Sequence, residues 1–383
     1  KKNHQLHIFL LPFMAQGHTI PIIDMAKLFS IQGGLRTSII TTPVNATHVS
    51  KLLERTKKVD ILTIKFPCHR PTAMLADPLE RLLNRYSPTC LVSDWFFPWS
   101  TDVASNCGIP RFVFHGTRFF SSCAIECGRF SPSEIKLTRQ QQPDYVKRET
   151  HDLSKMYIDM KESEIKSNGV LVNSFYELES GYADHYRKVL GRKAWHIGPF
   201  WFWNCDTQNK AKRGKEASID EHECLAVSGQ QFIWVVKKNI EEDKEDWLPE
   251  GYEKRIEGRG LIIRRWTPQL LILEQEAGGF VIHCGWNSTL EAIIAGVPMV
   301  TWPVSAEQFY NEKLVTGTLN IGVRVGVQKG AALVGDRVKK DAIEKVIIAT
   351  KLGEMAKRAV GEGGSSHSDF NAFNEELKST NSI

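Results

Sequence analysis

Short apolar runs alternate with amphipathic segments along the N-terminal half of the chain. The runs Leu6–Leu11 and Thr89–Ser93 are nearly continuous in hydrophobic residues, as expected of strands buried on both faces of a parallel sheet. Between such runs apolar residues recur at helical spacing, for example Ile22, Met25 and Phe29. Strands that alternate with helices imply right-handed crossovers and an open parallel sheet. The pattern therefore predicts an α/β fold for this half.

Two polar residues follow strands of this predicted sheet. His18 lies in the loop 12–19 after the first strand, and Asp94 directly follows the fourth. The helix after the loop is expected to begin near Pro21, because proline suits the first turn of a helix. The carboxyl ends of parallel strands meet at one edge of a sheet, where ligands bind. We therefore expect His18 and Asp94 to lie on the same rim.

The C-terminal half repeats the alternation and predicts a second Rossmann-like sheet. Its apolar runs include Gln231–Val236, Gly260–Arg264 and Gly279–Ile282. The last of these leads into a glycine-containing turn, and Asn287 and Ser288 then open an apolar-periodic helix. The free N–H groups and the positive dipole end of such a helix favour an anion. The pattern thus predicts a phosphate site at this turn.

The composition of the chain limits the classes of protein to which it can belong. The chain has 383 residues, of which 42% are hydrophobic and 24% charged, so two globular domains are expected. A scattered net charge of +5 argues against a nucleic-acid partner, and no apolar run approaches the ~20 residues of a membrane span. Eight cysteines without a C-x-x-C pair, and no signal peptide, predict reduced thiols and a cytoplasmic protein. A monomer is the default expectation.

The stretch Trp266–Gln308 resembles the signature segment of the plant secondary-product UDP-glycosyltransferases. Its matching pieces are W-x-P-Q at Trp266–Gln269, H-C-G-W-N-S at His283–Ser288, Glu291, G-V-P-M at Gly296–Met299 and E-Q at Glu307-Gln308. Further likeness extends to Pro12–His18, Ser93–Trp99 and Gly363–Ser366. The resemblance implies a GT-B fold, in which two Rossmann-like domains face a cleft. The implied domains are an acceptor-binding domain (1–198), a UDP-sugar-binding domain (199–360) and a C-terminal helix (361–383) that packs back on the first.

The resemblance also distributes roles over the signature segment. Trp266 would stack on uracil, where a core tryptophan is the plainer alternative, and Gln269 offers a donor and an acceptor to the base or ribose. Glu291, one helical turn after Asn287, would accept from ribose hydroxyls. The diphosphate would be bound by His283, Asn287, Ser288 and the N–H groups around them, including that of Gly285, and the sugar by Glu307 and Gln308 with Trp286 as their neighbour. The glutamine at position 308 favours glucose.

Glycosyl transfer to a hydroxyl needs a base, and His18 fits because imidazole titrates near neutral pH. Asp94 would hold one ring nitrogen, as the carboxylate of a catalytic triad does. Neither a metal nor another cofactor is expected. The family implies inverting transfer from UDP-glucose to a small apolar metabolite such as a flavonoid or triterpenoid. The acceptor is expected against Phe13-Met14, Trp95-Phe96 and Phe119-Phe120.

The chain is shorter than the family norm, and the losses are internal. Between Cys224 and Gly229 a strand and a phosphate-contacting turn are missing, and the segments near Phe66–Leu82 and Phe130–Asp144 are also short. Either the sequence lacks segments that the natural chain has, which we favour, or the deletions are real and expose sheet edges. True deletions would favour a catalytically silent sugar-nucleotide-binding protein. A nicotinamide dehydrogenase is disfavoured, since no G-x-G-x-x-G follows Leu6–Leu11.

Overall fold

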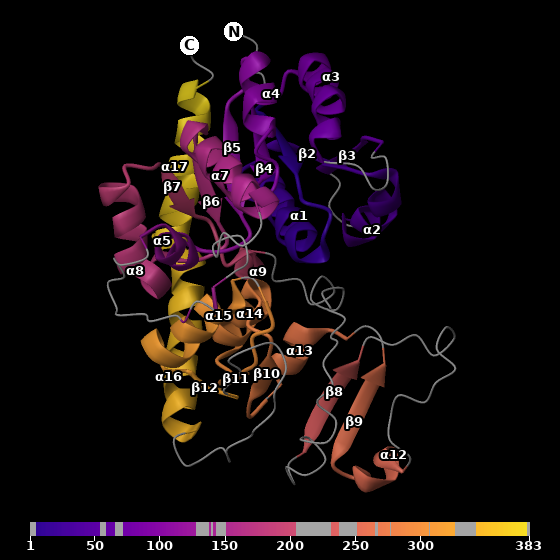
Figure 1. Cartoon of the computed structure of the whole chain (residues 1–383), viewed down its shortest axis with the longest axis vertical. Helices are drawn as coiled ribbons and strands as arrows, with labels where there is room; N and C mark the ends of the chain where they lie inside the picture. The colour runs from indigo at the N-terminus through magenta and orange to yellow at the C-terminus, as the bar shows by residue number, and fades with distance from the viewer. Residues whose placement is uncertain are drawn as a thin grey trace.

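The structure is a computed structural model of the chain (Figure 1). It describes residues 5–53, 59–65, 72–127, 138, 141–142, 151–203, 231–236, 251–264, 267–275, 277–305, 307–325 and 342–380. Trp266 and the segment from Cys224 to Gly229 lie outside these residues.

The N-terminal half is built on one parallel sheet of seven strands in the order β3-β2-β1-β4-β5-β6-β7. In chain order the strands are β1 (His7–Leu11), β2 (Arg36–Thr41), β3 (Val59–Thr63), β4 (Cys90–Asp94), β5 (Arg111–His115), β6 (Gly169–Val172) and β7 (Ala194–His196). The order turns back at β1 and β4, which pair directly. The predicted parallel sheet is confirmed.

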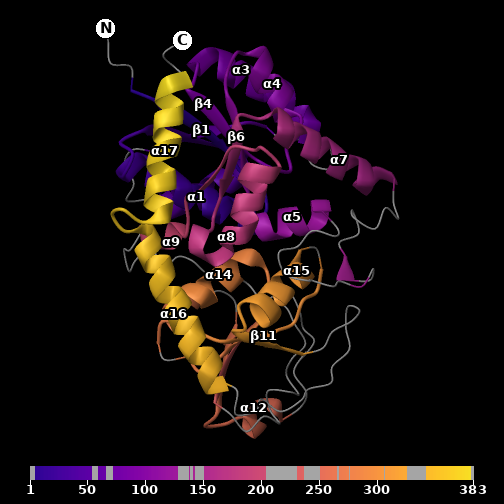
Figure 2. The ribbon, with the colours of Figure 1, turned by 90° about the vertical axis from the view of Figure 1, so that its left-hand side faces the viewer.

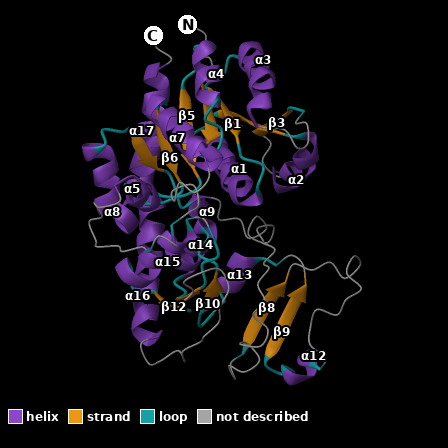
Figure 3. Cartoon of the chain, in the orientation of Figure 1, coloured by secondary structure: helices purple, strands orange, loops and turns teal. Residues whose placement is uncertain are grey.

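Helices cover both faces of this sheet (Figures 1 and 3). They are α1 (Gln16–Ile31), α2 (Pro43–Leu53), α3 (Ala76–Tyr86), α4 (Ser100–Asn106), α5 (Phe119–Cys127), α7 (His151–Lys166), α8 (Tyr176–Asp184) and α9 (Phe200–Trp203), with a 3-10 turn at Thr72–Leu75 and a π turn at His185–Val189. Ile8 and Leu10 of β1 pack in the cluster that contains α1, whereas Phe9 and Leu11 pack with α3 and α4. Successive residues thus enter opposite cores, as the period of a strand requires.

The first helix begins earlier than predicted, so the expected loop position of His18 is wrong. α1 starts at Gln16, which places His18 in its first turn and Pro21 inside the helix. Proline has no N–H, so the carbonyl of Gly17, four residues earlier, receives no helical hydrogen bond from it. Near the start of the helix this loss costs little free energy, because the carbonyl of Gly17 accepts a hydrogen bond from the side chain of Asn287 instead.

The strands of the C-terminal half form two separate sheets. β8 (Phe232–Val236) pairs with β9 (Gly260–Arg264), while β10 (Phe280–Ile282), β11 (Met299–Thr301) and β12 (Gly322–Arg324) form the other sheet. Within the described residues neither β8 nor β10 has a second partner strand. Figure 1 shows the β8–β9 pair standing apart from β10. The expected single sheet is therefore interrupted at the place where the sequence lacks a strand.

The helices of this half are α12 (Tyr252–Arg255), α13 (Gln269–Leu273), α14 (Trp286–Ala295), α15 (Gln308–Lys313) and α16 (Ala342–Val360), with a π turn at Leu314–Thr318. The last helix, α17 (Ser365–Thr380), returns to the N-terminal sheet (Figure 2). Phe370 and Phe373 of α17 stack on Phe29 of α1, and Asp369 pairs with Arg187. A continuous chain segment thus ties the two halves together.

The described residues contain no helix that is long and apolar enough to cross a membrane. The same part of the chain holds no group of three or more His, Cys, Asp or Glu side chains that could bind a metal ion. Cys90, Cys107, Cys123 and Cys284 are free thiols.

Candidate active site

The structure brings His18 and Asp94 together. His18 Nδ1 lies 2.7 Å from Asp94 Oδ2, because β1 and β4 are adjacent, Asp94 ends β4, and His18 lies in the first turn of the helix that follows β1. Asp94 is fully buried, and the N–H of Phe96 donates to its other oxygen at 3.0 Å. The carboxylate is thereby fixed, and it fixes the imidazole through Nδ1. Nε2 of His18 is left as the nitrogen that can take a proton.

The environment of His18 changes its pKa. Burial lowers the pKa of the imidazole, but the Asp94 carboxylate and, from the C-terminal half, Glu307 oppose this effect. The net result is a pKa above the usual value. His18 is therefore a stronger base than free imidazole once it is neutral, as proton abstraction from a hydroxyl requires.

Aromatic side chains pack against the imidazole ring of His18. Phe13 and Phe96 meet the His18 ring edge-on, with centroids 5.4 Å and 5.3 Å away. Gly116 lies on another side, where a Cβ atom would come within 3.4 Å of Nδ1. Two of the expected acceptor loops, at 13–14 and 95–96, thus reach the base. The third expectation is wrong, because Phe119 and Phe120 are buried against Tyr186 and Tyr182.

The predicted anion site lies at the start of α14. Gly285 is the N-cap without a capping side chain, and the N–H of Thr289 is the first to bond back into the helix. The N–H groups of Trp286, Asn287 and Ser288 are therefore those that a helix of this kind leaves for a ligand. A Cβ on Gly285 would lie 2.4 Å from Nε2 of His283, so the turn brings this imidazole against the helix mouth.

Gln269 and Glu291 meet beside that mouth. Nε2 of Gln269 donates to Glu291 Oε2 at 2.6 Å and lies 3.4 Å from the hydroxyl of Ser288. This arrangement joins two residues that the sequence assigned to the base and the ribose. Trp266, the expected stacking platform for uracil, is outside the described residues.

The side chain of Trp286 lies between the two halves of the chain. Its Nε1–H donates to the carbonyl of Asn173 at 2.8 Å, and its ring is covered by Arg118. The guanidinium of Arg118 is 4.4 Å from the Trp286 centroid and 4.6 Å from that of Phe120. Burial lowers the pKa of Arg118 to about 9. Only the backbone of Trp286 is thus directed at the helix mouth. Nothing in the sequence pattern indicated that Arg118 would lie here.

Asn287 connects the anion site to the base. Its Nδ2 donates to the carbonyl of Gly17 at 2.8 Å, and Gly17 precedes His18. This is the carbonyl that Pro21 leaves without a helical partner. The proline therefore makes possible a hydrogen bond between the first turn of α1 and the first turn of α14.

Glu307 and Gln308 occupy the loop and first turn after β11. Oε1 of Gln308 accepts from the N–H groups of Val304 and Ser305 at 2.7 Å and 2.9 Å, so this oxygen shapes its own loop. Glu307 faces the N-terminal half and is close enough to raise the pKa of His18. A sugar bound by Glu307 would therefore lie near the base.

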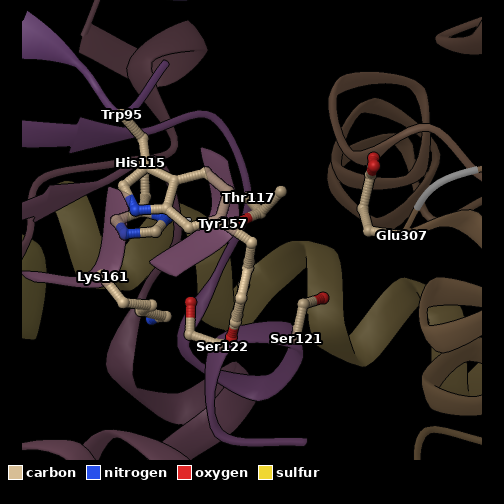
Figure 4. Close-up of a pocket in the computed structure, with 8 residues that line it drawn as sticks. All are labelled: Trp95, His115, Thr117, Ser121, Ser122, Tyr157, Lys161 and Glu307. Atoms are coloured by element: carbon tan, nitrogen blue, oxygen red, sulfur yellow. Dashed lines mark hydrogen bonds between the residues drawn. The ribbon is translucent and has the colours of Figure 1, made fainter. Parts of the chain in front are cut away.

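A pocket lies between residues of the N-terminal half and Glu307 of the C-terminal half (Figure 4). Its lining is Trp95, His115, Thr117, Ser121, Ser122, Tyr157, Lys161 and Glu307. In Figure 4 Glu307 faces the other residues from across the pocket. Two of the lining residues, His115 and Thr117, flank Gly116, where an added Cβ would come 3.4 Å from Nδ1 of His18.

Most of this lining was missed by sequence reasoning. Tyr157 and Lys161 belong to α7, a polar helix without a motif, and they reach the pocket only through the fold. Behind them Glu164 accepts from Tyr186 at 2.6 Å and lies 2.5 Å from His115 Nε2. Burial alone would raise the pKa of Glu164, but Lys161 and His115 hold it well below its usual range. Glu164 is thus an anion within the wall of the pocket.

Comparison with known proteins identifies the family. The sequence model described as UDP-glucoronosyl and UDP-glucosyl transferase matches residues 215–347. UDP-glucose flavonoid 3-O-glucosyltransferase 7 of Fragaria ananassa is 44% identical over 98% of this chain and 97% of its own. Scopoletin glucosyltransferase of Nicotiana tabacum is 41% identical over 99% of both chains.

Solved structures of plant proteins are also similar to this chain. Glycyrrhiza uralensis UGT73P12, solved with glycyrrhetinic acid 3-O-monoglucuronide, has a TM-score of 0.87 at 29% identity, over 99% of this chain and 96% of that one. Phytolacca americana UGT2, at 21% identity and a TM-score of 0.81, shares the fold. The predicted GT-B fold is thereby confirmed.

The relatives also confirm that the chain is short. UDP-glycosyltransferase 73B3 of Arabidopsis thaliana aligns over 480 positions, at 42% identity and 99% of its length, whereas this chain has 383 residues. Because 98% of the chain takes part, the missing positions are internal. Identity and coverage at this level establish descent, and the chain belongs to the plant UDP-glycosyltransferase family of enzymes.

Proposed function

We propose that this protein transfers glucose from UDP-glucose to a hydroxyl group of a small apolar plant metabolite, with inversion at the anomeric carbon. The observation that carries the proposal is the His18–Asp94 pair, 2.7 Å apart, in the first turn of a helix that contacts α14 through Asn287. The relatives named for flavonoid and scopoletin glucosyl transfer support an aromatic acceptor.

The proposed reaction is a direct displacement. Nε2 of His18 takes the proton of the acceptor hydroxyl as its oxygen attacks the anomeric carbon. The bond from that carbon to the β-phosphate oxygen breaks, and UDP leaves with the electron pair. Asp94 stabilises the imidazolium, and the N–H groups at the mouth of α14 meet the charge that develops on the diphosphate.

The C-terminal residues divide the donor between them in this proposal. Gln269 and Glu291 bind the base and ribose, as their mutual hydrogen bond places them together. His283, Gly285, Asn287 and Ser288 bind the diphosphate, together with the N–H of Trp286. Glu307 and Gln308 bind the sugar, and Trp266 stacks on uracil. Residues 1–198 bind the acceptor, 199–360 bind the donor, and 361–383 join them, in a cytoplasmic monomer.

The test is product formation from UDP-glucose with a panel of hydroxylated flavonoids, coumarins and triterpenoids, followed by mass spectrometry. We expect a β-glucoside with at least one acceptor. UDP binding by calorimetry without any product or UDP-glucose hydrolysis would instead select a silent binding protein. The interruption between β8 and β10 is the observation that favours this second candidate.

A further inference from the structure

A second buried charge lies behind the His18–Asp94 pair. Arg111 opens β5, and its side chain donates hydrogen bonds to residues at the end of the neighbouring strand β4. Only 2% of Arg111 is exposed, and Asp94 is fully buried. A buried ion is costly unless hydrogen bonds and an opposite charge stabilise it. The partners of Arg111 therefore bear on the carboxylate that holds His18.

Three hydroxyl groups accept hydrogen bonds from the Arg111 guanidinium. Nε donates to Ser93 Oγ at 2.7 Å, and Nη1 donates to Thr101 Oγ1 at 2.5 Å and to Ser163 Oγ at 2.7 Å. These hydroxyls lie on β4, α4 and α7, so Arg111 joins three elements. Thr101 and Ser163 also bond to each other at 2.7 Å, and Ser93 bonds to Ser100 at 2.8 Å. Removal of the guanidinium would therefore leave none of these hydroxyls without a partner.

Two carbonyl groups of the turn after β4 accept from the same guanidinium. Nη2 of Arg111 lies 3.4 Å from the carbonyl oxygen of Asp94 and 3.4 Å from that of Phe97. In the same turn the N–H of Phe96 donates to Asp94 Oδ1. Asp94 is thus bonded to His18 through its carboxylate and to Arg111 through its main chain. Arg111 therefore helps to fix the turn that carries Asp94.

The hydrogen-bond partners of Arg111 are all uncharged oxygen atoms, so its charge is balanced by carboxylates that it does not touch. Burial lowers the pKa of Arg111 to about 9, and Asp94 opposes this effect more than Glu164 or Asp102 does. Glu164 has cationic partners in direct contact, and Asp102 lies at an exposed position. The attraction between Arg111 and Asp94 is mutual, so Arg111 also stabilises the buried negative charge of Asp94.

We propose that Arg111 is a positioning residue of the His18–Asp94 pair, because it fixes the turn of Asp94 and supplies the positive charge that balances this carboxylate. An ionised Asp94 accepts from Nδ1–H of His18 and leaves Nε2 for the acceptor hydroxyl. The charge of Arg111 also disfavours a second positive charge on the imidazole, so it lowers the pH at which His18 becomes a base. This inference rests on the proposed function, in which His18 is the base.

The experiment removes the charge of Arg111 and follows the acid limb of the kcat/KM profile at saturating UDP-glucose. In Arg111→Met the limb should move to higher pH by about one unit, because the pair then binds a proton more readily. Glu307 beside His18, and Glu164 and Asp102 near position 111, are unchanged in this comparison. A purely structural role predicts the opposite sign, since a loosened Asp94 would raise the pKa of His18 less. An unchanged limb, or a shift to lower pH, would overturn the proposal.

Further variants separate the charge from the hydrogen bonds. Thr101→Val removes a hydroxyl that Arg111 contacts but keeps the charge, so thermal stability should fall while the acid limb stays in place. Arg81→Met, at an exposed position of α3, is the matched control and should change neither. Arg111→Gln keeps hydrogen-bond donors without the charge, and it should move the limb as Arg111→Met does. It decides if Arg111→Met does not fold; if neither folds, Arg111 serves stability and the proposal is wrong.

Failure of this inference differs from failure of the proposed function. The titration of His18 can be followed without substrate by NMR of the imidazole protons, with His18→Ala to assign the signal. If the wild-type protein glucosylates an acceptor and Arg111→Met leaves this titration unchanged, the inference alone is wrong. If no acceptor yields product, the proposed function is wrong, and a titration of His18 that moves to higher pH in Arg111→Met would still support the balance of charge.

Discussion

Both halves of the molecule contain parallel β-strands, but the strands pack differently in the two halves. In the N-terminal half seven parallel strands form one sheet, and β1 and β4 are buried on both faces. In the C-terminal half the described residues give the pair β8–β9 a core of three buried residues, Trp234, Tyr252 and Ile256. Ile233 of β8 is 48% exposed and Leu261 of β9 is 55% exposed.

This difference shows which parts of the site depend on a complete sheet. The His18–Asp94 pair needs two adjacent strands, and the intact N-terminal sheet supplies them. The mouth of α14 needs only β10 and its own first turn, and α14 is packed against α16 and the N-terminal half. The site can therefore persist although β8 and β9 are separated from β10.

The largest contrast is expected in hydrogen exchange. Amides of β1 and β4 should exchange only on global unfolding, whereas those of β8 and β9 should exchange by local opening. With a global free energy of unfolding of about 5–15 kcal/mol, the rates should differ by at least about 10⁴-fold. Exchange followed by mass spectrometry measures this, with β5 as a second protected reference. Comparable protection of β8 and β1 would contradict the separation.

Substitutions in the two hydrophobic cores should also differ in their effect on the free energy of unfolding. Phe112 is fully buried between Trp195 and Phe373, so Phe112→Ala should lower the free energy of unfolding by about 3–5 kcal/mol. Trp234→Ala removes a ring of similar size from the β8–β9 core. It should change the main transition by less than about 1 kcal/mol, because that unit opens separately. Denaturant unfolding followed by circular dichroism compares the two variants; equal losses would show one cooperative unit.

Removing the charge of Asp94 should change both the rate and its pH dependence. Asp94 raises the pKa of His18 against the opposing effect of burial, so Asp94→Asn should lower that pKa. With His18 as the proposed base, kcat/KM should rise as pH passes its pKa, so the acid limb of the profile should move to lower pH. The plateau should fall by about 10²-fold, since the imidazolium loses its partner. Asp102→Asn, at an exposed position of α4, should leave the profile unchanged.

Loss of the hydrogen bond between Asn287 and Gly17 should have the smallest of these effects. Asn287→Ala removes the contact between the anion site and the turn that carries His18. One hydrogen bond of about 1–1.5 kcal/mol corresponds to a roughly tenfold lower kcat/KM for UDP-glucose. Asn371→Ala, at an exposed position of α17, is the matched control. An unchanged kcat/KM would show that the contact does not position the base.

The N-terminal fold and the dyad were predictable because they follow from local pattern and topology. Buried runs define parallel strands, and parallel strands place the residues after them on one rim, so 76 intervening positions do not matter for His18 and Asp94. The start of α1 was not predictable from Pro21, because proline is also accepted within the first turns when its lost hydrogen bond is replaced elsewhere. That replacement comes from Asn287, in the distant C-terminal half.

The lining of the pocket could be predicted from the sequence only in part. Trp95 follows Asp94 and was expected near the acceptor, but Lys161 and Tyr157 lie on a polar helix whose orientation depends on packing against β6. Phe119 and Phe120 resemble pocket residues by type, yet the start of α5 turns them into the core. Residue type alone does not distinguish a buried ring from one that faces a ligand. By contrast, the separation of β8 from β10 within the described residues was anticipated by the short sequence between Cys224 and Gly229.

The central claim is that His18 of the N-terminal half and the donor site of the C-terminal half form one glucosyltransferase site. The most direct test is the rate of glucoside formation by His18→Ala relative to the wild-type protein, at saturating UDP-glucose. The account predicts a loss of about 10²–10⁴-fold with UDP affinity unchanged by calorimetry. Glucoside formation at the wild-type rate in His18→Ala would contradict it.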